Sequence, residues 1–374
     1  MEEAFMASVD RLKKDYPWIK TPLVVGAPMR LIALAPLALE ISRAGGIGFI
    51  GAGTDVSTLE DELLHAQRLL SSNPMPSYGL QTNTSSTSTL PLGIGFINWG
   101  AATVPSLDLI RRFRPAAVWF FAPHDIENLQ YWTTETRSVA PSTRVWVQVG
   151  CVTDAAEVVR HCHPDVLVVQ GTDAGGHGLV QGAGIVSLMP EVSDAVEEMV
   201  RKGVIEEEQA PALLAAGGIA EGRGAAAVLA LGAAGVVMGT RFLASWEANV
   251  AKGYRDEVVR AKDGGQSTVR TKVYDTLRGT TGWAEGYNAR GLINKSFVDA
   301  AEGMGEEENK RLYQEELAKG NRGWGADGRL TTYAGAAVGL VREIKPAAEI
   351  VVEVREGARR VIELVRRRVR EIEL

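Results

Sequence analysis

Cysteine is scarce in this chain, and long apolar runs are absent. The 374 residues include only two cysteines, Cys151 and Cys162, too few for a disulfide framework, which favours a reducing compartment. No apolar run approaches the roughly 18 residues of a membrane span. The stretch from Met1 to Tyr16 also lacks the apolar centre of a secretory signal. We therefore expect a cytoplasmic protein with no membrane partner.

Basic charge is not in excess either. The chain carries 46 acidic and 40 basic residues, a net charge of −6. Without a basic stripe, nucleic acid is not expected as a partner. His161-Cys162-His163 invites a metal interpretation, but adjacent side chains cannot easily face one ion and no second cluster completes the ligand set. We predict a helix end before Pro164 there, and no metal site.

Glycine, in contrast, is abundant. The 41 glycines make up about 11% of the chain, against a usual ~7%. They show no collagen-like period, so they indicate tight turns or places where backbone approaches something closely. One run, Gly46–Gly51, fits the GxGxxG pattern. It lies across a predicted strand instead of in a strand-to-helix turn, so no dinucleotide site is predicted from it.

Short apolar runs alternate with helical stretches in eight strand–helix units. Runs that are apolar on both faces are typical of parallel strands covered on each side. Eight such units in about 230 residues favour an α/β TIM barrel, with an open doubly wound sheet as the alternative. The predicted strands are Leu23–Val25, Ile47–Phe49, Leu92–Phe96, Ala117–Phe121, Arg144–Val149, Val166–Val169, Ala212–Ala215 and Gly235–Met238.

Three segments fall outside this repeat. Thr82–Thr89 is a polar low-complexity loop. Residues 253–335 are rich in glycine, charge and tryptophan, which indicates an insertion or lid following a barrel core of residues 1–252. Residues 336–374 carry a helical apolar stripe with interleaved charges, which predicts a helix packed on the barrel. Four aromatic residues of the insertion could line a pocket or merely pack: Trp283, Tyr287, Trp324 and Tyr333.

Glycines also follow the seventh and eighth predicted strands. In TIM barrels, functional residues collect at the carboxyl ends of the strands, and the last two loops often hold phosphate. Gly217-Gly218 and Gly239-Thr240 lie at these positions, each before a helix whose N-terminus favours an anion. The alternative is that these glycines only form tight turns. Both expected positions carry the pattern together, which favours the phosphate site.

A histidine follows the sixth predicted strand in the loop Gln170–Gly178. His177 comes after two glycines that cannot shield it, so it can project over a bound ligand and act as a base near neutral pH. Taken alone, the residue somewhat favours the interpretation as a surface loop histidine. Its position at the carboxyl end of a barrel strand favours the functional interpretation.

Together these motifs resemble the nitronate monooxygenases. The resemblance is carried by Ala27–Met29, Gln170–Gly178, Gly217–Ile219 and Met238–Phe242, in matching order over roughly residues 20–250. Gly95–Trp99 and Asn288–Asn294 further resemble the eukaryotic, fungal-like branch. The resemblance implies an FMN-dependent TIM barrel that oxidises alkyl nitronates with molecular oxygen to a carbonyl compound and nitrite. Nitroalkanes are a second candidate substrate.

The resemblance also implies roles for single residues. His177 matches the catalytic histidine, which acts as base toward neutral nitroalkanes and positions anionic nitronates. Gln170 stands where some relatives have Asp, and Asp173 where many bacterial members have Glu. Ala27, Pro28 and Met29 match a segment near the isoalloxazine ring, and Asn98 and Gln148 match flavin contacts. The phosphate and ribityl cradle would comprise Gly175, Gly176, Gly217, Gly218, Gly239 and Thr240.

Other flavin proteins share parts of this pattern. A flavin-dependent enoyl-ACP reductase has a similar Gly-Gly-His loop, and an NAD(P)H:quinone reductase can use the same scaffold. A flavin-binding protein without catalysis is a third alternative. All of them imply a small-molecule ligand, and none fixes the oligomeric state.

Overall fold

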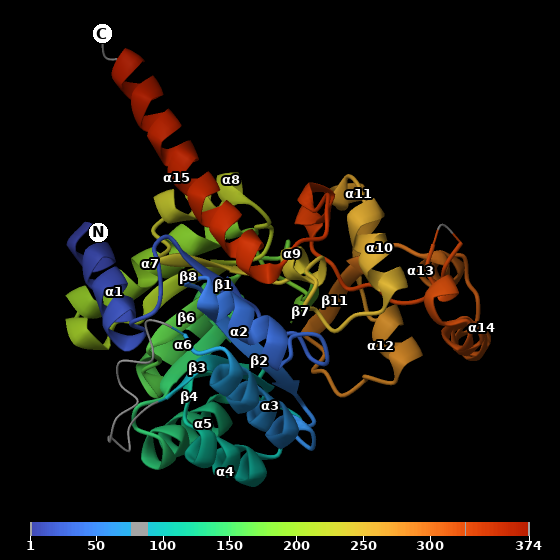
Figure 1. The fold of residues 1–374 in the computed structure, drawn as a ribbon, viewed down its shortest axis with the longest axis horizontal. Helices are drawn as coiled ribbons and strands as arrows, with labels where there is room; N and C mark the ends of the chain where they lie inside the picture. Colours follow the sequence, from blue (N-terminus) through green and yellow to red (C-terminus); the bar gives the residue numbers. More distant parts are fainter. Residues whose placement is uncertain (1, 76–88, 326, 373–374) are drawn as a thin grey trace.

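The chain folds around a closed barrel of eight parallel strands (Figure 1). The structure is a computed structural model that describes residues 2–75, 89–325 and 327–372. Strand β1 pairs with both β2 and β9, which closes the barrel. The predicted TIM barrel is therefore confirmed, and each predicted strand lies within an observed one. The barrel strands are β1 Leu23–Gly26, β2 Ile47–Gly53, β3 Leu90–Ile97, β4 Pro115–Phe121, β5 Arg144–Val149, β6 Val166–Gln170, β8 Ala212–Ala216 and β9 Gly235–Met238.

Helices surround this barrel. Gly46–Gly51 runs into and along β2, as predicted, and its glycines serve packing. A Cβ placed on Gly48 would come within 2.0 Å of the Ala38 carbonyl oxygen, so α2 lies directly on the strand. The helices of this part are α1 Glu2–Asp15, α2 Ala35–Arg43, α3 Leu59–Ser72, α4 Thr103–Phe113, α5 Ile126–Val139, α6 Val152–Cys162, α7 Ile185–Arg201, α8 Gly222–Ala230 and α9 Thr240–Leu243.

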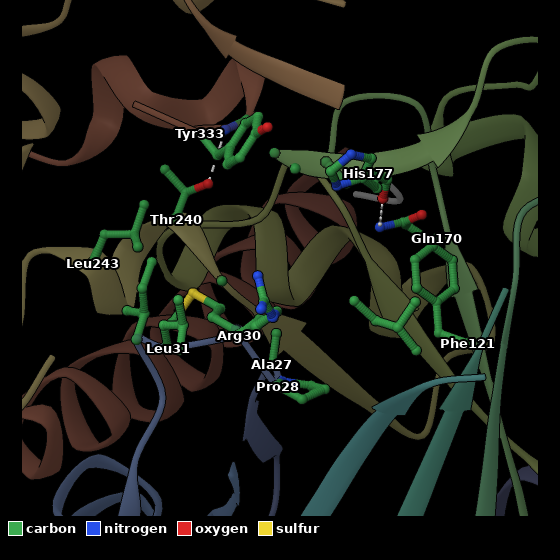
Figure 2. A pocket seen from close by; sticks show the side chains of 18 of the residues that line it. Ala27, Pro28, Arg30, Leu31, Phe121, Gln170, His177, Thr240, Leu243 and Tyr333 are labelled. Atoms are coloured by element: carbon green, nitrogen blue, oxygen red, sulfur yellow. Dashed lines mark hydrogen bonds between the residues drawn. The ribbon is translucent and has the colours of Figure 1, made fainter. Parts of the chain in front are cut away.

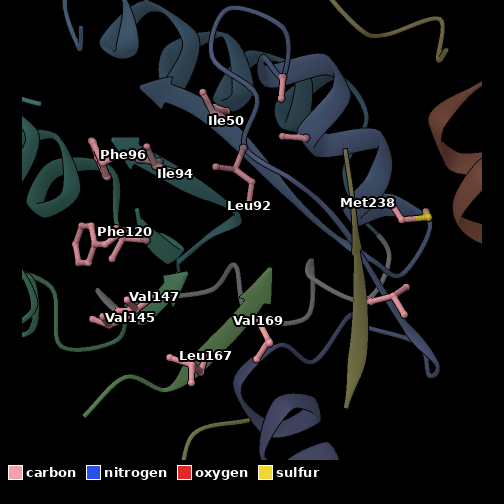
Figure 3. Close-up of a cluster of buried hydrophobic side chains, with 14 of the residues drawn as sticks. Ile50, Leu92, Ile94, Phe96, Phe120, Val145, Val147, Leu167, Val169 and Met238 are labelled. Atoms are coloured by element: carbon pink, nitrogen blue, oxygen red, sulfur yellow. The ribbon is translucent and has the colours of Figure 1, made fainter. Parts of the chain in front are cut away.

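Side chains fill both surfaces of the barrel wall. Those pointing outward pack beneath the helices, among them Phe96 and Phe120 (Figure 3). Those pointing inward form a second cluster that includes Phe49, Trp119 and Trp146, with ring centroids 4.9–5.9 Å apart. The interior is therefore a packed core, and space for a ligand remains at the carboxyl ends of the strands.

A second, smaller sheet stands beside that end of the barrel, and the sequence did not predict it. It has the order β10-β11-β7 and joins β7 Gly176–Leu179, from the histidine loop, to β10 Thr268–Thr271 and β11 Tyr287–Leu292. The pairing is antiparallel, with Ala289 opposite His177. The helices of the same region are α10 Lys252–Arg260, α11 Gly264–Ser267, α12 Val273–Arg278, α13 Lys295–Ala301 and α14 Glu306–Ala318.

The last helix, α15 Ala347–Ile372, has two unlike halves. Ile350, Val354 and Ala358 are buried against the barrel and α8. Beyond them the helix projects away from the body (Figure 1), and Val365 is 52% exposed. Only the first half of this predicted segment therefore packs on the barrel.

Further expectations concern other parts of the chain. Helix α6 ends at Cys162 and His163 is its C-cap, as predicted for the segment before Pro164. No cluster of metal-ligating side chains occurs among the described residues. Within the same ranges, no helix is long and apolar enough to cross a bilayer. Thr82–Thr89, apart from its last residue, lies outside the described residues.

Candidate active site

A cavity of about 750 Å³ opens at the carboxyl ends of the barrel strands (Figure 2). This volume falls in the range of about 300–1,000 Å³ that small-molecule sites occupy. The barrel loops form one side, and residues 278–283, Trp324 and Tyr333 form another. The structure brings every predicted site residue except Asn98 to this cavity: His177, Ala27, Pro28, Met29, Gln148, Gln170, Gly175, Gly176, Gly217, Gly218, Gly239 and Thr240.

Asn98 lies behind the cavity wall. Its side chain is buried, and its Oδ1 accepts a hydrogen bond from the Phe121 backbone N–H at 2.9 Å. This bond ties the end of β3 to the end of β4. The Nδ2 group of Asn98 is buried without a hydrogen-bond partner, so it retains an unused donor next to the site.

Glycine backbone lines the part of the cavity at the carboxyl ends of β8 and β9. Gly217 and Gly218 have φ angles of 95° and 73°, in the left-handed region that side chains other than glycine rarely adopt. Gly239 has an ordinary φ of −106°. A Cβ there would find Ala27 and Met29 at 3.7 Å, two residues that line the same cavity. Backbone can therefore approach a phosphate or ribityl group here, and a single methyl group would take up that space.

Two glutamines also line the cavity. The Oε1 atom of Gln148 accepts a hydrogen bond from Trp119 Nε1 at 3.1 Å. The Nε2 group of Gln170 donates to the His177 backbone carbonyl at 3.3 Å (Figure 2). Gln170 thus fixes the backbone that carries the histidine, and both amides are held in one orientation.

The His177 ring contacts a carboxylate that sequence reasoning missed. Its Nε2 atom lies 2.8 Å from Oδ1 of Asp275, on α12. The same oxygen accepts hydrogen bonds from the hydroxyls of Thr280 and Tyr333, at 3.0 and 3.2 Å. Two hydroxyl donors and the histidine ring nitrogen therefore converge on one oxygen atom, and the side chain of Asp275 is only 7% exposed.

Aromatic rings enclose this pair. Trp283 stacks on His177 with ring centroids 3.8 Å apart and planes 8° from parallel. Burial, and then the Asp275 charge, raise the pKa of Tyr333, so its hydroxyl remains a donor. Trp283, Trp324 and Tyr333 line the cavity, in agreement with the pocket alternative. Tyr287 does not line it; its ring packs 5.8 Å from Trp283.

Two arginines, on β10 and β11, hold the histidine loop by hydrogen bonds to its backbone. The guanidinium groups of Arg270 and Arg290 both donate to the backbone carbonyl of Thr172. Burial, reinforced by the nearby Arg290, lowers the pKa of Arg270 to about 10. This value leaves Arg270 charged at neutral pH. The residues were visible in the sequence, but their common target depends on β10 and β11 lying side by side.

Two other arginines line the cavity itself. The Nε atom of Arg30 is buried without a hydrogen-bond partner. Arg278 lies with its guanidinium carbon 5.3 Å from the centre of the Tyr333 ring. Neither forms an ion pair with a carboxylate in the described part of the chain. Both can therefore interact with an anionic ligand.

Comparison with known proteins gives a consistent result. A family model described as nitronate monooxygenase matches residues 133–357. The chain is 47% identical to nitronate monooxygenase npaC of Metarhizium robertsii, over 94% of this chain and 95% of that protein. It is 35% identical to a nitronate monooxygenase of Neurospora crassa, over 96% and 94% of the two chains.

Solved structures share the architecture. The structure of FabK from Thermotoga maritima superposes with a TM-score of 0.67 at 25% identity, covering 95% of this chain and 98% of that one. A nitroalkane oxidase from Streptomyces ansochromogenes gives the same TM-score at 20% identity, covering 94% and 99%. At that identity the second match shows a common fold.

Proposed function

The chain belongs to the nitronate monooxygenase family, and from this premise we propose that it oxidises alkyl nitronates with molecular oxygen to a carbonyl compound and nitrite, with FMN as cofactor. It is an oxidoreductase on a flavoenzyme scaffold that acts on a small molecule. The observation that carries the proposal is the position of His177. It lines the same cavity as the glycine loops, and its ring is held by Asp275.

The residues that line the cavity support the binding of a flavin nucleotide. Gly217, Gly218 and Gly239 leave backbone accessible where a phosphate would lie, before the helices α8 and α9. Ala27–Met29 and Gln148 would border the ring, with a polar atom available from the glutamine amide. The unpartnered Nε of Arg30 offers a positive charge within the same space. When FMN is bound, the chemistry it supplies is electron transfer from the nitronate to oxygen.

The chain's own residues would orient and protect the substrate. A nitronate is an anion, so His177 and the cavity arginines can hold its oxygens by charge-assisted hydrogen bonds. A neutral nitroalkane must first lose a proton, and His177 is the base placed to accept it. Trp283 and Tyr333 cover the histidine with apolar surface and limit the access of water to it.

Two measurements test the proposal. The purified protein should show the visible spectrum of oxidised flavin and release FMN on denaturation. It should then consume oxygen with a pre-formed nitronate and without NAD(P)H. A colourless protein that binds no added FMN would remove the cofactor assignment. Rapid anaerobic reduction by NADH without any response to nitronate would favour the enoyl-ACP or quinone reductase activity. Bound FMN without turnover of either kind would favour a binding protein.

A further inference from the structure

We propose that Asp275 is a positioning residue that keeps the hydrogen of the His177 ring on Nε2, so that Nδ1 is the atom that removes the substrate proton. The inference rests on the proposed function, because it assigns the base within that reaction. It adds a residue from α12, which is 98 positions from the histidine, and it chooses between the two ring nitrogens.

The identity of the partner decides the tautomer. An ionised carboxylate can only accept hydrogen bonds, so the ring nitrogen next to it must carry the hydrogen. Nε2 of His177 is the nitrogen that lies 2.8 Å from Asp275. In the neutral ring the lone pair is then on Nδ1. No residue in the described part of the chain hydrogen-bonds Nδ1, and His177 lines the cavity.

The surroundings hold both side chains in place. Thr280 and Tyr333 donate to the same carboxylate oxygen, which leaves Asp275 little freedom to rotate. The parallel stack of Trp283 on His177 restricts the ring to one plane. If the ring flipped by 180° about its Cβ–Cγ bond, Cε1 instead of Nε2 would face the carboxylate, and the hydrogen bond would be lost. Only one ring orientation therefore satisfies Asp275.

Proton transfer in this arrangement balances without another reactant. The C–H bond next to the nitro group breaks, its electron pair moves toward the nitro group, and the substrate becomes a nitronate. The proton forms a new N–H bond at Nδ1. The ring becomes an imidazolium that still donates its Nε2 hydrogen to Asp275, whose negative charge stabilises it. Asp275 itself exchanges no proton.

Kinetics with two substrate forms separate this role from general support of the fold. The Asp275→Asn variant keeps an oxygen acceptor and removes the charge. With a neutral nitroalkane, we expect kcat/KM to fall by about 100-fold or more, within the usual contribution of a general base. A pre-formed nitronate needs no proton removal, so its kcat/KM should fall much less, by about tenfold at most, because only the charge-assisted hydrogen bond from His177 is weakened. Asp256→Asn, an exposed change on α10, is the matched control and should change neither value.

The pH profile gives an independent readout. The titratable groups facing His177 are Asp275 and Tyr333, with Arg278 over the tyrosine ring. Loss of the Asp275 charge disfavours the imidazolium, so the acidic midpoint of nitroalkane kcat/KM should move to lower pH in Asp275→Asn. Equal losses with both substrates and an unchanged midpoint would overturn the proposal.

Nitrogen NMR tests the tautomer without relying on turnover. The chain has five histidines, so a spectrum of His177→Gln identifies the signals of His177 in the 15N-labelled holoprotein. We expect the neutral ring to carry its hydrogen on Nε2 in the wild type and to become a tautomer mixture in Asp275→Ala. A wild-type signal with hydrogen on Nδ1 would refute the inference. If nitronate turnover is absent but the Nε2–H signal is present, the proposed function fails and the tautomer assignment stands.

Discussion

Gly239→Ala should weaken flavin binding without weakening the fold. Gly239 has an ordinary backbone conformation, and an added Cβ would have no protein atom nearer than 3.7 Å. The flavin-free protein should therefore accept the methyl group at a cost below about 0.5 kcal/mol, typical of a surface or open site. The same methyl group occupies cavity space that the cofactor needs, and overpacking costs about 1–3 kcal/mol.

That penalty predicts a roughly 5- to 150-fold rise in the Kd for FMN. The assay is fluorescence titration of flavin-free protein with FMN, alongside thermal unfolding of the flavin-free wild type and variant. The two proteins should differ in Tm by less than about 1 °C, because the entropy gained on unfolding is about 2 cal/mol/K per residue and is therefore large for a chain of this length.

Gly217→Ala is the contrasting change. Its φ of 95° disfavours any side chain, and its Cβ would lie 2.7 Å from the Gly171 carbonyl oxygen. We expect a loss of about 2–3 kcal/mol even without flavin, from the left-handed conformation and the contact together. If Gly239→Ala binds FMN with wild-type affinity, the cofactor does not lie against Gly239 and the proposed cradle is wrong.

Three further predictions concern other parts of the chain. His177→Asn should lower the kcat/KM of neutral nitroalkanes by about 10²–10⁴-fold in an oxygen-uptake assay; full retention would exclude it as the base. Burial raises the pKa of Tyr287 to about 12, above its ordinary value near 10. The unfolded chain therefore loses this proton first, and the free energy of unfolding should fall as the pH rises from about 10 to 12. Tyr287→Phe should reduce that slope in urea titrations, and an unchanged slope would contradict the shift. Deleting residues 362–374 should leave Tm nearly unchanged because the side chains of residues 362–370 are exposed, whereas Ile350→Ala should cost about 2–5 kcal/mol; thermal unfolding of both variants compares the two halves of α15.

The barrel could be predicted because its signals are local. Each apolar run is short, is followed by a helical stretch, and needs no knowledge of distant residues. The glycine loops and His177 could be placed for the same reason, since the carboxyl ends of parallel strands must meet at one end of the barrel. Even the misleading Gly46–Gly51 motif could be set aside from its position on a strand.

Asp275 could not be found in this way. It belongs to a short helix in a region without a regular apolar period, and its partner lies on a strand formed only when β7 meets β11. The common target of Arg270 and Arg290 depends on the same pairing. For Asn98, the position after β3 could be predicted from the sequence. The orientation of its side-chain amide, whose oxygen accepts from the Phe121 backbone N–H, could not.

The pairing of β7 with β11 has a consequence for the exchange of parts between related enzymes. Because His177 stands directly opposite Ala289, the strand that carries the histidine shares its backbone hydrogen bonds with the region after the barrel. In a chimera that replaces residues 253–335 alone, the β11 strand of the other enzyme would have to pair with the β7 of this chain. Ala289 is fully buried, so a larger residue at that position would press on the histidine's neighbours. The unit that can be recombined intact therefore includes β7 together with that region, although the two are far apart in the sequence.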